Sequence, residues 1–385
     1  MSAIEKENPL RTLARFGQSV WCDNISRDLL RSGGLVELIA RDGVVGVTSN
    51  PTIFKKAMTG GREYDDDIRE LLDHGESIAR IRELLSLRDI AEAADALRPV
   101  YERTNGADGY VSVEVGPKLA HDTQGSLAEA RRFRDALQRP NVMVKIPGTR
   151  EGARAVEQAT REGMSINITL LFGIGQYERV MEAYMRGLEA RVSAGESIAG
   201  IHSVASFFVS RVDTFVDKRL DELCQSGRVK SDEAAFLRGK AGIANGRIAY
   251  QHFERKFRGH RWEELATKGA TVQRPLWAST GVKDPSYPDT MYVDALIGHA
   301  TVNTMPEATI RVYRDHGHPS PDTVCGHVEA SHAVIERCAQ LGILIEDVAQ
   351  KLQDEGIESF AKATRDLDKA LAQKGDRLRP HAIAG

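Results

Sequence analysis

The chain has 385 residues, of which 41% are hydrophobic and 28% are charged. That composition can bury a large core but is too charged for a membrane protein, and no stretch approaches the roughly eighteen uninterrupted apolar residues of a membrane span. A formal net charge of -3 and a sequence pI near 6.4 give no overall field that would attract nucleic acid or an anionic membrane, and residues 1–21 lack the apolar core of a signal peptide. We therefore expect a soluble, cytoplasmic globular protein with neither nucleic-acid nor membrane partners.

From about Ser19 onward, short β-rich segments alternate with long, charged, alanine-rich segments that favour helix. This alternation is typical of a parallel sheet with helices packed outside it. The candidate strands, in chain order, are residues 19–23, 44–49, 110–115, 141–146, 164–170, 201–206, 274–279 and 291–298. Eight such units predict an α/β fold, a (β/α)8 TIM barrel with additional helices between strands and at the C-terminus.

A barrel of this kind typically takes about 250 residues, so this chain has a surplus. Length alone would also fit two average domains, but the eight units favour a single barrel domain over residues 1–385. We expect the surplus in helical insertions at about 58–105 and 213–272 and in C-terminal helices from Asp322 onward. The end of the chain, about 376–385, is predicted to be a flexible tail.

Four cysteines, Cys22, Cys224, Cys325 and Cys338, are scattered without a paired motif. In a chain long enough to be stable without disulfides, they are interpreted as reduced thiols. Cys325 lies in a region with four histidines that could suggest a metal site, namely His316, His318, His327 and His332. Their spacings match no standard zinc pattern, so ordinary helix and loop residues are the favoured interpretation.

The predicted strands place polar residues on one face only. In residues 141–146, Val142, Val144 and Ile146 share a face, while Met143 and Lys145 share the other. In a parallel barrel the outward face is apolar, and inward residues at the carboxyl ends of the strands meet at the barrel mouth. Six strand-end residues would converge there: Asp23, Asn50, Glu114, Lys145, Asn167 and Ser206. Each alone is more simply a structural hydrogen-bonding residue, but six in succession indicate a shared cavity.

Lys145 is the unusual member of this set, because a strand interior disfavours an ammonium group. Desolvation can leave a buried lysine uncharged near neutral pH, and the free amine can then form a Schiff base with a carbonyl. An imine to a ketose is an electron sink that allows the neighbouring carbon–carbon bond to break. Asp23 and Glu114 would supply carboxyls for proton transfer. Neutral groups on Asn50, Asn167, Thr169 and Ser206 suit a polyhydroxylated substrate.

Several segments taken together resemble the transaldolase family, in its longer bacterial subgroup. These segments cover nearly the whole chain in the family's order: GVTSNPTIF (46–54), VMVKIPGT (142–149), SINITLLF (165–172), SFFVSRVD (206–213) and WASTGVKDP (277–285). The resemblance implies a barrel with the lysine on its fourth strand and no metal or organic cofactor. It also implies reversible transfer of a dihydroxyacetone unit from sedoheptulose 7-phosphate to glyceraldehyde 3-phosphate, which gives erythrose 4-phosphate and fructose 6-phosphate.

The resemblance also implies catalytic roles. Lys145 would form the imine, and Asp23 would act as acid and base at the hydroxyl where the bond is cleaved. Glu114 would assist imine formation through a water molecule that Thr169 positions.

Further residues would bind the substrate. Asn50 and Asn167 would bind the donor's hydroxyls, Ser206 would add a contact, and Arg211 would hold the phosphate with Ser279 beside it.

One departure concerns the phosphate site. Shorter transaldolases place an arginine two residues after the serine that corresponds to Ser279, whereas this chain has Gly281 there. Lys283 is the candidate for the second positive charge, although a lysine lacks the bidentate geometry of arginine.

Two alternatives remain open. A fructose 6-phosphate aldolase-like enzyme would release the three-carbon unit instead of transferring it, and nothing in the strand pattern excludes this. A non-catalytic sugar-phosphate-binding barrel is disfavoured because Lys145, Asp23 and Glu114 are all present. The sequence does not reveal the oligomeric state.

Overall fold

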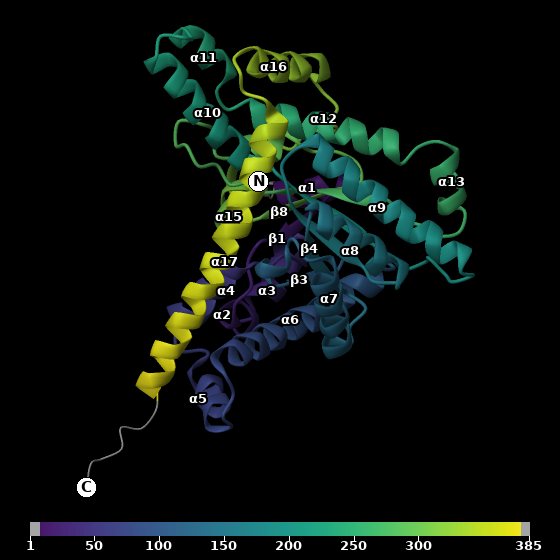
Figure 1. Ribbon diagram of the computed structural model, residues 1–385, viewed down its shortest axis with the longest axis vertical. Coiled ribbons are helices and arrows are strands. Elements are labelled where there is room, and N and C mark those ends of the chain that lie inside the picture. The colour runs from purple at the N-terminus through teal and green to yellow at the C-terminus, as the bar shows by residue number, and fades with distance from the viewer. Residues whose placement is uncertain (1–7, 379–385) are drawn as a thin grey trace, which may run out of the picture.

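The computed structural model of the chain describes residues 8–378 (Figure 1). Eight parallel strands pair in chain order, and β1 pairs with both β2 and β8, so the sheet closes into a barrel. The strands are β1 (Gln18–Cys22), β2 (Val44–Val47), β3 (Tyr110–Glu114), β4 (Val142–Pro147), β5 (Ile166–Leu171), β6 (Ser203–Phe208), β7 (Gln273–Ala278) and β8 (Thr301–Met305). The predicted (β/α)8 barrel is confirmed.

The eighth strand lies further along the chain than predicted. A strand at 291–298 is wrong, because Met291–Ala295 form the short helix α14 and β8 begins only at Thr301. The apolar side chains of the predicted segment are buried at helix-like spacings of one, three and four residues: Tyr292, Val293, Leu296 and Ile297. β8 itself was hidden by its two threonines and one asparagine, which are buried polar residues and weaken the apolar signal of a strand. The other seven strands agree with prediction to within two residues at each end.

Alternate residues of the strands pack into separate layers. On β4, Val144 and Ile146 join the layer between strands and helices, whereas Met143 packs inside the barrel. The interior is filled by large apolar side chains from several strands: Trp21, Tyr110, Met143, Val204, Leu276 and Val302. With the interior filled by these residues, the polar residues further along the strands are left at the barrel mouth.

The outer layer consists of helices. Their bounds are α1 (Pro9–Arg15), α2 (Arg27–Arg31), α3 (Gly34–Glu37), α4 (Pro51–Gly60), α5 (Asp65–Asp73), α6 (Ile78–Arg103), α7 (Thr123–Leu137), α8 (Arg150–Arg161), α9 (Ile174–Ser193), α10 (Ser210–Gln225), α11 (Ser231–Leu237), α12 (Ala241–Lys256), α13 (His260–Ala266), α14 (Met291–Ala295), α15 (Glu307–His316), α16 (Val328–Gln340) and α17 (Ile345–Leu378), with a π-helical turn at Leu38–Asp42 and a 3-10 turn at Pro117–Leu119. Within residues 8–378, none of these helices has both the length and the apolar character needed to cross a bilayer.

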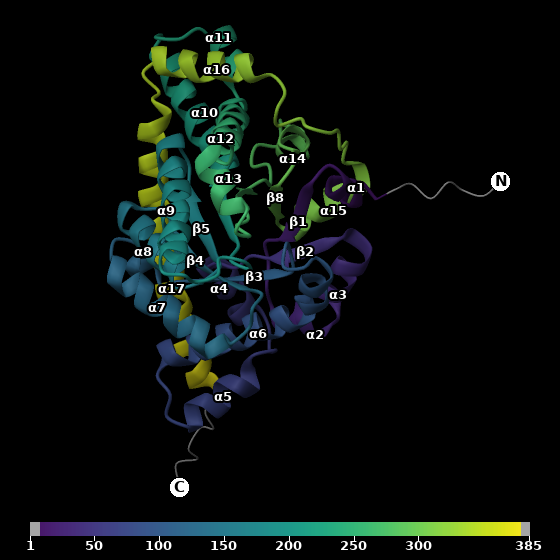
Figure 2. The ribbon, with the colours of Figure 1, turned by 90° about the vertical axis from the view of Figure 1, so that its right-hand side faces the viewer.

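The surplus residues form helices between strands and after the last strand. α5 and α6 lie between β2 and β3, and α11 to α13 lie between β6 and β7. Figure 2 shows α10, α11, α12 and α16 gathered at one end of the molecule and α5 at the other. Residues 376–378 of the predicted tail belong to α17, and the rest of that tail lies outside the described residues.

α17 runs the length of the molecule and crosses the carboxyl end of β5 (Figures 1 and 2). The amide of Gln353 donates to the carbonyl of Leu170 at 2.9 Å, and Gln176 donates to the carbonyl of Ala349 at 3.2 Å. A Cβ added at Gly356 would lie 2.9 Å from the Leu170 side chain, so this glycine allows the helix to approach the strand closely. α17 therefore covers the end of the barrel that carries the predicted site.

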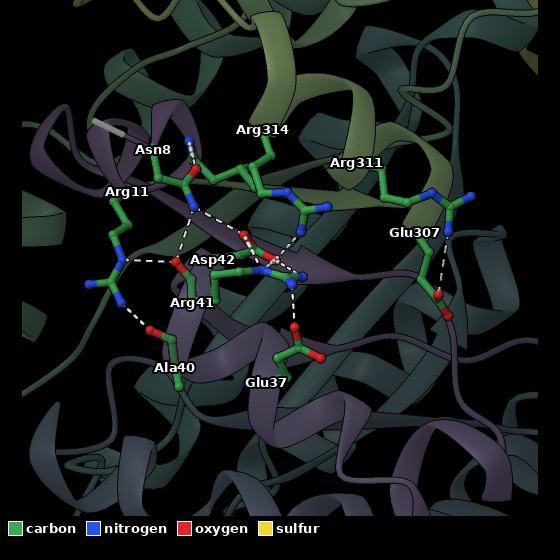
Figure 3. A network of polar contacts seen from close by, with 10 residues as sticks. Asn8, Arg11, Glu37, Ala40, Arg41, Asp42, Glu307, Arg311 and Arg314 are labelled. Atoms are coloured by element: carbon green, nitrogen blue, oxygen red, sulfur yellow. Dashed lines mark hydrogen bonds and ion pairs between the residues drawn. The ribbon is translucent and has the colours of Figure 1, made fainter. Parts of the chain in front are cut away.

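A polar network around one buried carboxylate joins the two ends of the barrel sequence (Figure 3). Asp42, the last residue of the π-helical turn, is fully buried and accepts hydrogen bonds from Asn8 at 3.0 Å and from Arg41 at 2.9 Å. Arg314, on α15, donates to the same carboxylate at 3.0 Å. Because Asn8 caps α1, this one carboxylate links α1, the turn before β2 and the helix after β8.

Candidate active site

Lys145 lies near the carboxyl end of β4 with its side chain only 5% exposed. Its Nζ donates to the backbone carbonyl of Ser49 at 3.1 Å and lies 3.5 Å from Oε2 of Glu114. In the sheet register, Lys145 is the partner of Glu114 on β3 and of Asn167 on β5. Partner residues on adjacent parallel strands point to the same face, so the register alone brings these three polar side chains together.

Glu114 is the nearest carboxyl to the amine, and its side chain is also 5% exposed. Burial raises the pKa of Glu114 to about 7, although the neighbouring Lys145 opposes this shift. Its Oε2 accepts no hydrogen bond from any residue in the described part of the chain. A carboxyl that titrates near neutral pH can both donate and accept a proton.

Asp23 directly follows β1. Its Oδ1 accepts a hydrogen bond from the Thr48 hydroxyl at 2.7 Å. Burial raises the pKa of Asp23, while the charges of Lys145, Arg211 and Lys283 act to lower it. The charges of these three cations therefore all influence the Asp23 carboxyl. Asp23 thus lies between the predicted Schiff-base lysine and the predicted phosphate-binding residues.

A chain of side-chain hydrogen bonds runs beside the amine. The Ser206 hydroxyl donates to Oδ1 of Asn167 at 2.7 Å, and Nδ2 of Asn167 donates to the Ser112 hydroxyl at 2.9 Å. All three side chains are buried. The contacts fix the orientation of the Asn167 amide next to Lys145.

Thr169 is fully buried on β5, and its hydroxyl makes no hydrogen bond with any residue between 8 and 378. The next residue, Leu170, has a positive φ of 59°, and the register of β5 against β6 shifts between Ile168 and Leu171. Such an irregularity changes the direction of side chains at a strand end. The Thr169 hydroxyl is left available for a small polar molecule such as water.

Asn50 has a structural task in addition to its predicted one. Its Oδ1 caps α4 by accepting from the backbone N–H groups of Thr52 at 3.0 Å and Ile53 at 3.1 Å. Only its amide nitrogen is left to contact a ligand. Asn50 and Glu114 line a cavity of about 450 Å³ between α4, α6 and α17.

The predicted phosphate residues lie on another side of the mouth. Arg211, in the first turn of α10, and Lys283 line a cavity of about 940 Å³ that extends between α10 and α17. The guanidinium of Arg211 lies over the ring of Phe208, 5.4 Å from its centroid. Ser279 has a positive φ of 56°, and its hydroxyl lies 2.9 Å from that of Ser210, so it stands beside the start of α10.

Three residues of this region were not predicted: Thr48, Ser112 and Asp213. Thr48 and Ser112 sit on the inward strand faces that already signalled the site, and they orient Asp23 and Asn167. Asp213 is buried two residues after Arg211, and its Oδ1 accepts from the backbone N–H of Gly242 at 2.7 Å. Burial raises the pKa of Asp213 to about 7. The sequence did carry a signal for Asp213, because it is an acidic residue among the apolar residues of one helix face.

The cysteines and histidines form no second centre in the described chain. All four cysteines are free thiols, with Cys22 and Cys338 buried and Cys325 exposed. Within residues 8–378, no group of three or more histidine, cysteine, aspartate or glutamate side chains is arranged to hold a metal ion.

By its fold and its site, this chain is a (β/α)8-barrel enzyme with its polar centre at the carboxyl ends of the strands. The model of the family described as Transaldolase/Fructose-6-phosphate aldolase matches residues 20–371. A Transaldolase of Thermobifida fusca (strain YX) is 50% identical over 95% of this chain and 98% of its own length. A Transaldolase of Acidothermus cellulolyticus (strain ATCC 43068 / DSM 8971 / 11B) is 46% identical over 97% and 98%. The chain belongs to the transaldolase/fructose-6-phosphate aldolase family.

Proposed function

We propose that this protein is a transaldolase that moves a dihydroxyacetone unit from sedoheptulose 7-phosphate to glyceraldehyde 3-phosphate and releases erythrose 4-phosphate and fructose 6-phosphate. The observation that carries the mechanism is the buried Lys145 amine, 3.5 Å from the Glu114 carboxyl and close to Asp23. The close relatives named Transaldolase support transfer as the overall reaction. The composition of the chain supports a cytoplasmic location.

The reaction begins at Lys145. Its free amine adds to the C2 carbonyl of the donor, and the protonated Glu114 gives its proton to the carbonyl oxygen. Glu114 next accepts the proton that the nitrogen loses, which gives a carbinolamine. Glu114 then protonates the leaving hydroxyl through a water molecule held by Thr169, and water departs as the iminium forms. The Thr169 hydroxyl and Oε2 of Glu114 make no hydrogen bond within residues 8–378, and such a water would bridge these two groups.

Asp23 carries the carbon–carbon chemistry. Its carboxylate takes the proton of the C4 hydroxyl, the bond between C3 and C4 breaks, and the electron pair moves through C2 to the nitrogen to leave an enamine on Lys145. The aldehyde product departs. The enamine then attacks the carbonyl of the acceptor, Asp23 returns its proton to the new alkoxide, and hydrolysis of the iminium frees the product and the amine.

The remaining polar groups hold the sugar. The amides of Asn167 and Asn50 and the hydroxyl of Ser206 would contact donor hydroxyls without adding charge. Arg211 and Lys283 would bind the phosphate, assisted by Ser279 and by the positive end of the α10 helix dipole. Phosphorylated sugars are therefore the substrates that this arrangement fits.

Borohydride trapping tests the imine. Reduction in the presence of fructose 6-phosphate should add one reduced three-carbon unit to the intact mass, because the aldehyde half has already left. Lys145→Ala should show no adduct and no turnover. An unmodified mass for the parent protein would overturn the proposal.

The family description includes fructose 6-phosphate aldolases, so transfer must be separated from release. A coupled assay would compare dihydroxyacetone formed without acceptor with transfer to erythrose 4-phosphate. Transfer should dominate. Faster release would assign the chain to the aldolase branch of the same family.

A further inference from the structure

The cavity that contains Arg211 and Lys283 is much larger than one phosphoryl group requires. It measures about 940 Å³ and reaches from the barrel mouth outward between α10 and α17. Its outer wall includes Phe215, Ile343 and Leu344, the last of which is 51% exposed. A sugar phosphate that reaches Lys145 would place its phosphate at the inner end of this cavity and leave the outer part unfilled.

The charges that line the cavity are unevenly neutralised. Its five cationic residues are Arg211, Lys218, Arg219, Lys283 and Lys351, and its three acidic residues are Glu222, Asp347 and Glu355. Arg219 pairs with Glu222 at 2.6 Å, and Lys351 pairs with Glu355 at 3.2 Å. Within residues 8–378, the other three cations make no hydrogen bond or ion pair.

These three unpaired cations are Arg211, Lys218 and Lys283. Arg211 and Lys218 are seven residues apart on α10, so they lie on the same face, separated by about 10 Å along the axis. Thr214 and Phe215, which lie between them on that face, also line the cavity. The cations therefore form a row that begins beside Asp23 and continues outward along one wall.

We propose that this cavity is a binding site for a linear polyphosphate chain. The inner phosphoryl group would occupy the site of Arg211 and Lys283, and the following groups would extend along α10 to Lys218. The proposal rests on the proposed phosphate site of the substrate and extends it. Since the inner positions are shared, a bound polyphosphate would exclude phosphorylated sugars and inhibit the enzyme competitively.

Calorimetric binding of orthophosphate and tripolyphosphate, in buffer without divalent metal, tests the site without any turnover. Wild-type protein should bind tripolyphosphate at least about tenfold more tightly than orthophosphate. Lys218→Gln should weaken tripolyphosphate binding about fivefold and leave orthophosphate binding within about twofold. Arg219→Gln is the matched control, because it removes one charge from the adjacent residue whose cation is already paired; it should leave both affinities nearly unchanged.

The outcomes separate this inference from the function on which it rests. Equal affinity for the two anions, or equal losses in Lys218→Gln and Arg219→Gln, would overturn the polyphosphate site while leaving the substrate phosphate site intact. Loss of tripolyphosphate binding in Lys218→Gln, with orthophosphate unaffected by Arg211→Ala, would instead support the outer site and contradict the proposed substrate phosphate site.

ATP, as a second ligand, distinguishes the two sources of this chemistry. Tighter binding of ATP than of tripolyphosphate would support a nucleotide ligand whose base covers Leu344. Weaker binding of ATP would support an inorganic chain at the same site.

Discussion

At the scale of single residues, the proposed proton transfer during imine formation depends on Glu114. Glu114 is enclosed on β3, and its carboxyl faces an amine that is held from the other side by the Ser49 carbonyl. Burial stabilises the neutral acid, and Lys145 stabilises the carboxylate. With a pKa of about 7, the residue can change protonation state within one catalytic cycle.

Glu114→Gln tests this role. The variant retains shape and burial but cannot donate or accept the proton, so the rate of imine formation should fall about 100-fold. In the parent protein this rate should also decline as pH rises through about 7, since Glu114 then loses the proton needed by the departing hydroxyl. The decline should be absent from the variant. Single-turnover trapping across pH measures both effects, and an unchanged pH profile would remove Glu114 from the mechanism.

At the scale of elements, α10 carries part of the proposed phosphate site at the barrel mouth. It carries Arg211 in its first turn and Asp217 nearly two turns later. The hydroxyl of Tyr287 donates to Oδ2 of Asp217 at 2.8 Å, and the N–H of Gly239 donates to Oδ1 at 3.1 Å. The loop with Lys283 is thereby tied to the helix that carries Arg211.

Tyr287→Phe should loosen that loop without touching the reacting groups. The Michaelis constant for phosphorylated sugars should rise about fivefold, equivalent to about 1 kcal/mol, with kcat nearly unchanged. Ser286→Ala is the control, because within residues 8–378 the Ser286 hydroxyl hydrogen-bonds only to Asp284 of the same loop. A comparable rise for unphosphorylated substrates would show that Tyr287 does not act through the phosphate site.

Asp213 makes the contact between α10 and α12 sensitive to pH. Gly242 has no room for a side chain, because an added Cβ would lie 2.7 Å from the Val209 carbonyl and 2.9 Å from Oδ2 of Asp213. The folded-state pKa of Asp213, about 7, exceeds its ordinary value of 3.8, so the folded protein holds this proton more tightly than the unfolded chain does. The stability contributed by this residue is present below about pH 4 and is lost as pH rises towards 7.

Asp213→Asn should remove that dependence, since the amide cannot ionise and its oxygen can still accept from Gly242. The melting temperature of the variant, relative to the parent, should rise between about pH 5 and pH 8. Asp221→Asn, on the same helix with a side chain 51% exposed, should give a difference that does not vary with pH. A constant difference for Asp213→Asn would contradict the assignment.

At the scale of the whole molecule, barrel closure depends on contacts between distant segments. β1 and β8 are register partners along all five residues of each strand, and Asp42 links the helices beside them through Asn8 and Arg314. A fully buried carboxylate loses much of its hydration on folding and depends on these partners.

Asp42→Asn should therefore lower the free energy of unfolding by about 2 kcal/mol, because an amide nitrogen replaces one of the two buried oxygens that accept from Asn8, Arg41 and Arg314. Glu37→Gln is the control: Glu37 pairs with the same Arg41 but is 61% exposed, so its loss should cost less than about 1 kcal/mol. Denaturant unfolding of the two variants gives the comparison. Equal losses of unfolding free energy in the two variants would show that burial of Asp42 adds nothing to the stability of the protein.

The site residues could be predicted as a set because alternation along a strand is a local property. Lys145, Glu114 and Asn167 stood on the inward faces of three strands, and the structure places them as register partners. Seven strands were recognisable for the same reason. The eighth was missed because Thr301, Asn303 and Thr304 are buried polar residues, each with at least one side-chain hydrogen bond, so no apolar run marks the strand.

The amino-acid sequence by itself determined the barrel and the inward polar residues, because both follow from periodicities of two and of three to four residues. Only the tertiary structure decided the pKa of Glu114, the capping role of Asn50, the partners of Asp42 and the course of α17 over β5. Each of these depends on burial or on contacts between residues far apart in the chain, and neither is encoded in the spacing of neighbouring residues.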